Sequence, residues 1–155
     1  MNDEITKTPS QQDLTTRLHA AFAAESMTAQ RYFSFAQAAE IEGMVGLARL
    51  FSELAESASC AAQGHLDVLH YTDPMTDLPV GETGLNIASA LAACLRESTQ
   101  TYPDLAALAH ASGVADTASW LETLVALKKR HTERLQEALG TLTSPAAAQQ
   151  SEVSR

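Results

Sequence analysis

Apolar residues recur every three or four positions along most of this chain, which is the spacing of one face of an α-helix. The pattern runs over residues 14–41 and again over 45–69. It resumes over 85–111, and a last stretch covers 114–139. The chain is therefore predicted to form four long amphipathic helices.

Residues that start, bend or end helices mark the limits of these stretches. Ser10 and Asp13 have the spacing of a capping box at the first helix. Pro103 lacks a backbone donor and predicts a bend or a fresh start within the third stretch. Gly140 stands where a C-cap is expected for the fourth. Segment 71–84 contains two prolines and two glycines, which predicts a long connection.

Short links within each helix pair, with a long link between the pairs, are the connectivity of a ferritin-like four-helix bundle with one crossover. A weak internal repeat supports it, since Ala48 matches Ala118 at an offset of 70. Each half is then one helical hairpin. The fold class predicted is all-α, with the bundle over residues 10–140. Residues 1–9 are expected to be disordered, and residues 141–155 to form a flexible tail.

Composition narrows the function classes. Hydrophobic residues make up 45% of the chain and aromatic residues 5%, which excludes a wholly disordered chain and argues against a β-rich one. The net charge of −9 argues against binding to nucleic acid or to an anionic membrane. The first 13 residues are polar, so no secretory signal is expected, and two cysteines form no disulfide framework. A cytoplasmic location is predicted.

Two segments resemble a known family. The sequence AFAAESMTAQRYFSFA over residues 21–36 resembles the first helical hairpin of rubrerythrin, and QTYP over 100–103 with HTE over 131–133 resembles the second. The resemblance covers residues 14–139. It implies a ferritin-like bundle that normally holds two irons and reduces peroxide or activates oxygen. A rubredoxin domain, which often accompanies it, needs Cys-x-x-Cys pairs, and this sequence has none.

The resemblance also implies a set of ligands. The family pattern has a Glu on the first helix, Glu-x-x-His on the second, one or two Glu on the third and Glu-x-x-His on the fourth. Two metal ions of this kind require about four carboxylates and two imidazoles. Matched by position, Glu25, Glu97 and His131 retain three of these ligands.

The other ligand positions are changed. The Glu and His of the second helix fall on Ala58 and Ala61, the second carboxylate of the third helix falls on Cys94, and the Glu of the fourth helix falls on Lys128. Both bridging carboxylates are lost, so the resemblance implies that a conventional di-iron site does not form.

Two interpretations of the remaining residues stay open. Glu25 and Glu97 carry −2, while Lys128 and His131 carry +1 or +2, so a metal-free polar cluster is close to neutral. Alternatively, Glu25, Glu97 and His131 hold a single metal ion, iron if any, as a non-haem oxidoreductase would. Cys94 and Lys128 are the candidates for catalytic chemistry, as a thiol nucleophile and a desolvated amine, or else they are structural.

Three further residues are candidates for the surroundings of this site, or for plain packing: Tyr32, His65 and Tyr102. By analogy with the family the protein is expected to be a homodimer, and a protein partner is a further expectation.

Overall fold

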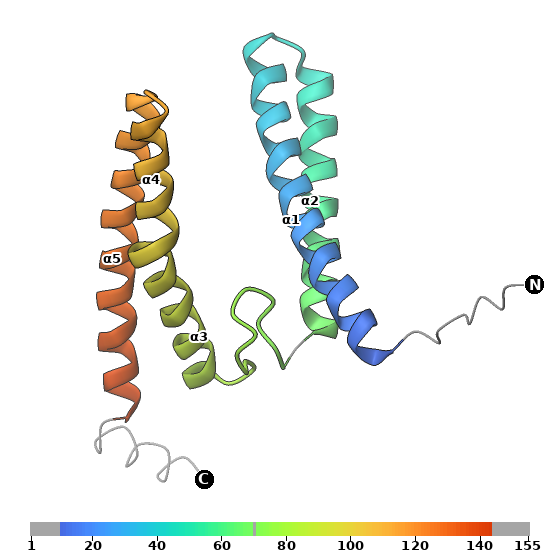
Figure 1. Ribbon diagram of the computed structural model, residues 1–155. Coiled ribbons are helices and arrows are strands. Elements are labelled where there is room, and N and C mark those ends of the chain that lie inside the picture. The colour runs from blue at the N-terminus through green and yellow to red at the C-terminus, as the bar shows by residue number, and fades with distance from the viewer. Residues whose placement is uncertain (1–9, 70, 144–155) are drawn as a thin grey trace, which may run out of the picture. The chain divides into compact units, whose positions relative to one another are not determined.

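The computed structural model describes residues 10–69 and 71–143. These residues form α-helices and one π-helical turn and contain no β-strand, so the all-α prediction is confirmed. The chain divides into two units, residues 1–70 and 71–155, each built on one helical hairpin (Figure 1). Within the described part, every helix is too short or too polar to cross a membrane. The disorder predicted for residues 1–9 falls outside the described residues, as does the flexible tail predicted over 141–155 except for residues 141–143, which are helical.

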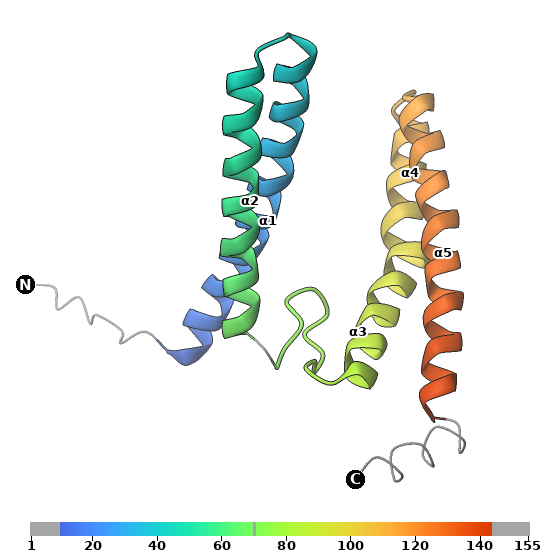
Figure 2. The ribbon, with the colours of Figure 1, turned by 180° about the vertical axis from the view of Figure 1, so that it is seen from behind.

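The first unit is the antiparallel pair of α1 (Gln11–Ile41) and α2 (Val45–Val68), which lie side by side in Figures 1 and 2. The predicted capping box begins α1: the Asp13 amide donates to Ser10 Oγ at 3.1 Å, and the Ser10 amide donates to Asp13 Oδ2 at 3.0 Å. Backbone and side-chain hydrogen bonds from Ser10 hold the pKa of Asp13 below its usual value.

Small side chains form the contact between α1 and α2. The buried residues of both helices are alanines, which allow the two backbones to approach closely: Ala36, Ala39, Ala48, Ala55, Ala58 and Ala62. An aromatic cluster closes the end near the turn. The ring of Phe51 lies 5.5 Å from that of Phe35 and 6.1 Å from that of Tyr32, centroid to centroid.

The second unit begins with the connecting loop, which is fastened to α3 (Thr83–Arg96) by side chains. Ser89 of α3 is 1% exposed, and its hydroxyl donates to Asp73 Oδ2 at 2.5 Å and also pairs with Thr76 Oγ1. Arg96 donates from Nη2 to the Met75 carbonyl at 2.7 Å. Burial alone would raise the pKa of Asp73, but the hydrogen bonds from Ser89, Met75 and Thr76 outweigh it and lower that pKa.

Replacing Ser89 with alanine is expected to destabilise the second unit by about 1–2 kcal/mol at neutral pH, because the Asp73 carboxylate loses a buried donor. A carboxyl group with a lowered pKa contributes stability above its ordinary pKa of 3.8, and this is lost as the pH falls through the folded value. The difference between the wild type and Ser89→Ala should therefore shrink at pH values below 3.8. Urea unfolding measures it, with the exposed Ser119→Ala as control. Equal unfolding of Ser89→Ala and wild type at neutral pH would contradict the role of this contact.

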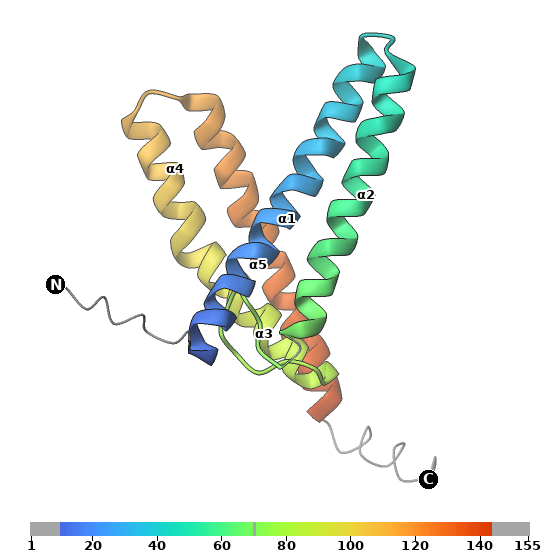
Figure 3. The ribbon, with the colours of Figure 1, turned by 90° about the vertical axis from the view of Figure 1, so that its right-hand side faces the viewer.

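Three segments follow α3 in the chain and make up the rest of the second unit. The α3 helix passes through a π-helical turn, η1 (Glu97–Thr101), into α4 (Tyr102–Ala111), and α5 (Ala115–Thr143) returns along them (Figures 2 and 3). The prediction of a bend or a fresh start near Pro103 is confirmed as a fresh start, because α4 begins at Tyr102 with the proline in its first turn. The predicted end of the last helix near residue 139 is wrong, because α5 continues through Gly140 to Thr143. The common glycine C-cap requires a positive φ, and Gly140 does not adopt one.

The internal repeat is confirmed by the two turns. Gly43 and Gly113 have φ of 74° and 73°, a left-handed conformation that favours glycine. After each glycine, the next residue donates its amide five positions back: Met44 to the Ala39 carbonyl at 2.8 Å, and Val114 to the Ala109 carbonyl at 3.0 Å. The same local chemistry therefore builds both hairpins.

Candidate functional site

The π-helical turn places the candidate residues of the second unit. Its i→i+5 geometry appears where the Tyr102 amide donates to the Glu97 carbonyl. In a regular α-helix, Tyr102 would lie about 140° around the axis from Glu97. The wider turn brings these two side chains toward one face. π-Helical turns of this kind are frequent at functional sites.

The sequence around the turn explains why the α-helical ladder breaks there. The hydroxyls of Ser98 and Thr99 both donate to the Leu95 carbonyl, at 3.1 and 2.7 Å. Such side-chain bonds compete with the backbone ladder and bend helices. Pro103 follows directly and offers no amide hydrogen. Sequence reasoning used Pro103 alone and missed the π-helical turn, which the Ser-Thr pair could have indicated.

The centre of the site is an ion pair between η1 and α5. Lys128 Nζ lies 2.7 Å from Glu97 Oε2, and the two side chains are only 23% and 12% exposed. The hydrogen bond to Glu97 raises the pKa of Lys128, partial burial lowers it, and the charges of Glu97, Tyr102 and Cys94 raise it again, so the net direction is upward. The structure thus pairs Lys128 with Glu97, and Tyr102 and Cys94 lie near enough for their charges to act on Lys128.

A cleft of about 390 Å³ opens beside this ion pair. It lies between α3 and α5, and its lining is Cys94, His131, Arg134, Leu135 and Ala138. Cys94 and His131 are both partly exposed. Arg134 was not among the residues singled out from the sequence. Its position three residues after His131 places it on the same helix face, which is the signal that could have found it.

The remaining predicted residues lie in the first unit. Glu25 is partly exposed on α1, and His65 is partly exposed on α2. Tyr32 packs against Phe35 and Phe51 in the aromatic cluster.

The two alanines matched to the second-helix ligands differ in their surroundings. Ala58 is 6% exposed in the contact between α1 and α2, whereas Ala61 is exposed.

Metal-ligating side chains do not gather into a group of three or more within residues 10–69 and 71–143. The residues of the single-metal alternative come from both units, Glu25 from the first and Glu97 and His131 from the second. That alternative stays a prediction.

Comparisons with known proteins agree with the resemblance in the sequence. The family model described as Rubrerythrin matches residues 17–139. The chain is similar to Rubrerythrin-1 of Clostridium acetobutylicum, with 28% identity over 126 residues. That alignment covers 76% of this chain and 65% of the clostridial protein, so this chain spans less than two thirds of that relative's length. The family match and the helical structure confirm the ferritin-like, rubrerythrin-type fold class.

Proposed function

Because this chain belongs to the rubrerythrin family, we propose that it is a divergent member whose di-iron centre is replaced by a polar cluster around the Glu97–Lys128 ion pair. Ordinary peroxide reduction and ferroxidase activity are then absent. The observation that carries the proposal is the distance of 2.7 Å between Lys128 Nζ and Glu97 Oε2.

A di-iron centre does not fit these residues. The Lys128 ammonium lies 2.7 Å from Glu97 Oε2, and the resemblance matches Lys128 to the fourth-helix Glu of the family. An ammonium group has no lone pair for a metal and repels a divalent cation. With Cys94 and Ala58 at two other ligand positions, the donor set lacks the carboxylates that two irons require.

The electrostatic balance favours the same conclusion. A carboxylate with 12% exposure is costly to leave unpaired, and in the di-iron members the metals supply the opposing charge. In this chain Lys128 supplies it from the protein itself. The pair therefore satisfies Glu97 without a metal, and the site serves as a structural or partner-binding element or supports other chemistry at Cys94 and Lys128.

Metal analysis tests this proposal directly. Protein purified without chelator or affinity tag is expected to contain well under one iron per chain, and to show no ferroxidase or peroxidase turnover above that of free iron. Iron content by mass spectrometry and an optical spectrum are the measurements. Two irons per chain with an oxo-bridge absorption band would refute the proposal, and one tightly held iron would favour the single-metal alternative.

The proposal also covers the cell compartment and the oligomeric state of the protein. Cys60 and Cys94 are both free thiols, which supports a reducing compartment such as the cytoplasm. Assembly as a homodimer, with or without a further protein partner, is supported by analogy with the family alone.

A further inference from the structure

The two cysteines of this chain have charged neighbours of opposite sign. Cys94 shares its cleft with the permanent cation of Arg134 and with His131, and no carboxylate is among the described residues that line it. Cys60, an exposed residue of α2, borders a cleft of about 900 Å³ together with Glu56, and no Lys, Arg or His belongs to the described lining of that cleft.

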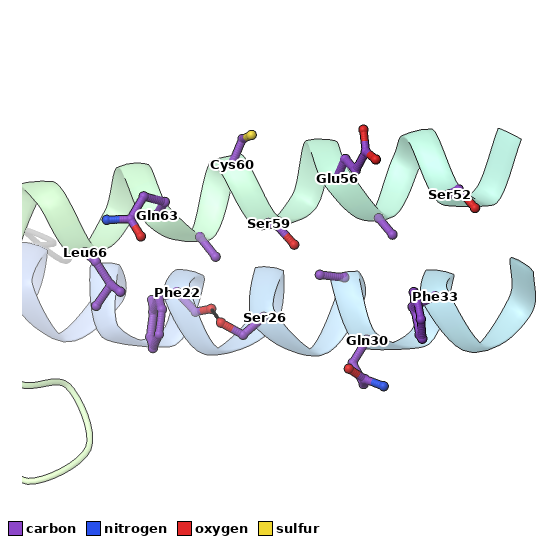
Figure 4. A pocket seen from close by; sticks show the side chains of 13 residues that line it. Phe22, Ser26, Gln30, Phe33, Ser52, Glu56, Ser59, Cys60, Gln63 and Leu66 are labelled. Atoms are coloured by element: carbon purple, nitrogen blue, oxygen red, sulfur yellow. Dashed lines mark hydrogen bonds between the residues drawn. The ribbon is translucent and has the colours of Figure 1, made fainter. Parts of the chain in front are cut away.

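Figure 4 shows the second arrangement: the Cys60 sulfur and the Glu56 carboxylate both point away from α1, on the same outer side of α2. Glu56 precedes Cys60 by four residues, one helical turn. A negative reagent that approaches the Cys60 thiol therefore meets a negative charge.

The charge near Cys94 has the opposite sign because one neighbouring cation is paired with a carboxylate and the other is not. The Lys128 ammonium is balanced by Glu97 at 2.7 Å. Arg134, in contrast, is an exposed residue that lines the cleft and forms no ion pair within residues 10–69 and 71–143. In a chain of net charge −9, a cleft whose described lining has a cation and no carboxylate is expected to repel an anionic reagent least.

We propose that Cys94 is a reactive thiol that forms mixed disulfides with small anionic disulfides, which Arg134 attracts into the cleft. This deepens the proposed function and rests on it, because the Cys94 sulfur must be free of metal. The cleft volume of about 390 Å³ suits a small molecule.

The chemical step is a thiol–disulfide exchange. The Cys94 thiolate attacks one sulfur of the incoming disulfide, a bond forms between Cys94 Sγ and that sulfur, and the disulfide bond of the reagent breaks. One half of the reagent stays on Cys94 and the other leaves as a thiolate. The proton of the Cys94 thiol passes to solvent or to the departing sulfur. One disulfide replaces another, so no further oxidant is required.

The test compares the two cysteines within one chain. The variants Cys60→Ser and Cys94→Ser each leave a single thiol, and each is treated with dithiodipropionate, which is anionic, and with cystamine, which is cationic. Adduct formation is followed by intact mass spectrometry. The ratio of the anionic rate to the cationic rate is expected to be at least about 5-fold higher for Cys94 than for Cys60 at low ionic strength. Both thiols are treated with the same two reagents, so the intrinsic reactivity of each reagent cancels when the two rate ratios are compared.

Charge variants assign the selectivity to the cleft. In the Cys60→Ser protein, Arg134→Gln is expected to lower the anionic rate about 3-fold or more, and about 0.5 M salt should remove most of the preference. The matched control is Lys129→Gln, which removes one positive charge from the same helix but lines a different cleft, with His110 and Glu122. This control should leave the rate nearly unchanged.

Three outcomes would overturn the proposal: equal ratios for the two thiols, equal effects of Arg134→Gln and Lys129→Gln, or a Cys94 thiol that reacts only after unfolding. Peptide mapping of adducts in the wild-type chain keeps the test valid if a variant fails to fold. Iron analysis of the same samples, and a repeat of the rate measurements after treatment with an iron chelator, distinguish failure of this inference from failure of the proposed function. Metal bound at Cys94 would slow the reaction until the chelator removed it, whereas a wrong inference gives no selectivity in metal-free protein.

Discussion

Replacing Lys128 with methionine is expected to lower the melting temperature by about 4–8 °C at neutral pH, equivalent to about 2 kcal/mol of unfolding free energy for a protein of this size. Methionine keeps the length and apolar stem of the side chain but removes the ammonium group. The Glu97 carboxylate, 12% exposed, then loses its partner at 2.7 Å. Breaking a buried ion pair costs about 3–5 kcal/mol, whereas a surface pair contributes about 0–1 kcal/mol to stability. The burial of the Lys128–Glu97 pair is intermediate, so the expected cost is intermediate too.

The pH dependence distinguishes a lost ion pair from lost packing. Protonation of Glu97 removes the unpaired charge in the variant, so Lys128→Met should approach the wild type in stability as the pH is lowered into the acidic range. At the alkaline end, Lys128 has a pKa raised above its ordinary value of 10.5, mainly by the hydrogen bond to Glu97. A group of this kind stabilises the fold below its unfolded pKa, and the contribution is lost as the pH rises through the folded value. The wild type should therefore lose its higher stability relative to Lys128→Met as the pH rises above 10.5.

Thermal melts across this pH range test the prediction, and Lys129→Met is the control. Lys129 is the exposed neighbour on the same helix, so its replacement should change the unfolding free energy by less than about 0.5 kcal/mol. If Lys128→Met and Lys129→Met melt alike at every pH, the ion pair contributes nothing measurable and the polar-cluster proposal loses its main support.

The helices and their partners were predictable from the sequence because local signals determine them. Apolar spacing marks each helix, Ser10 and Asp13 cap the first, and Gly43 and Gly113 form the turns. The last helix shows the limit of such signals. Gly140 resembles a C-cap in sequence, but glycine permits a positive φ without requiring it, and here the helix continues to Thr143.

The ion pair was predictable from position, whereas the cleft beside it was not. The rubrerythrin resemblance matched Lys128 to a ligand position, and its spacing of three residues from His131 put both on one face of α5. The structure shows that Lys128 pairs with Glu97. The approach of Tyr102 depends on the π-helical turn, a break in the very periodicity from which helical faces are assigned. The charge contrast between the surroundings of Cys94 and Cys60 depends on Arg134 and Glu56. In the sequence these two residues look like any other charged residue on the exposed face of a helix.

Restoring the family ligands is expected to create the metal binding that the proposed function denies to the wild type. The full variant carries Ala58→Glu, Ala61→His, Cys94→Glu and Lys128→Glu. It replaces the cation with a carboxylate and returns the number of carboxylates and imidazoles that two metal ions require. Without metal it should be less stable than the wild type, because Ala58 is 6% exposed in the contact between α1 and α2 and a carboxylate there is desolvated.

Added Fe(II) or Mn(II) should reverse this loss. A ligand at about 100 times its dissociation constant stabilises the folded state by about 2.7 kcal/mol, which a melting curve resolves readily. The measurements are metal content after gel filtration, expected to approach two per chain, and the melting temperature with and without metal. The wild type should respond to neither metal.

The control for this variant keeps side-chain size and removes ligating charge. It carries Ala58→Gln, Ala61→Asn, Cys94→Gln and Lys128→Gln, and it should bind no more metal than the wild type. A second variant with only Cys94→Glu and Lys128→Glu leaves the contact between α1 and α2 unchanged, so it remains informative if Ala58→Glu prevents folding. That variant should already gain metal-dependent stabilisation, because it surrounds Glu97 and His131 with carboxylates instead of an ammonium group. A folded protein that binds no metal in either form would show that these positions do not correspond to the di-iron ligands of the family.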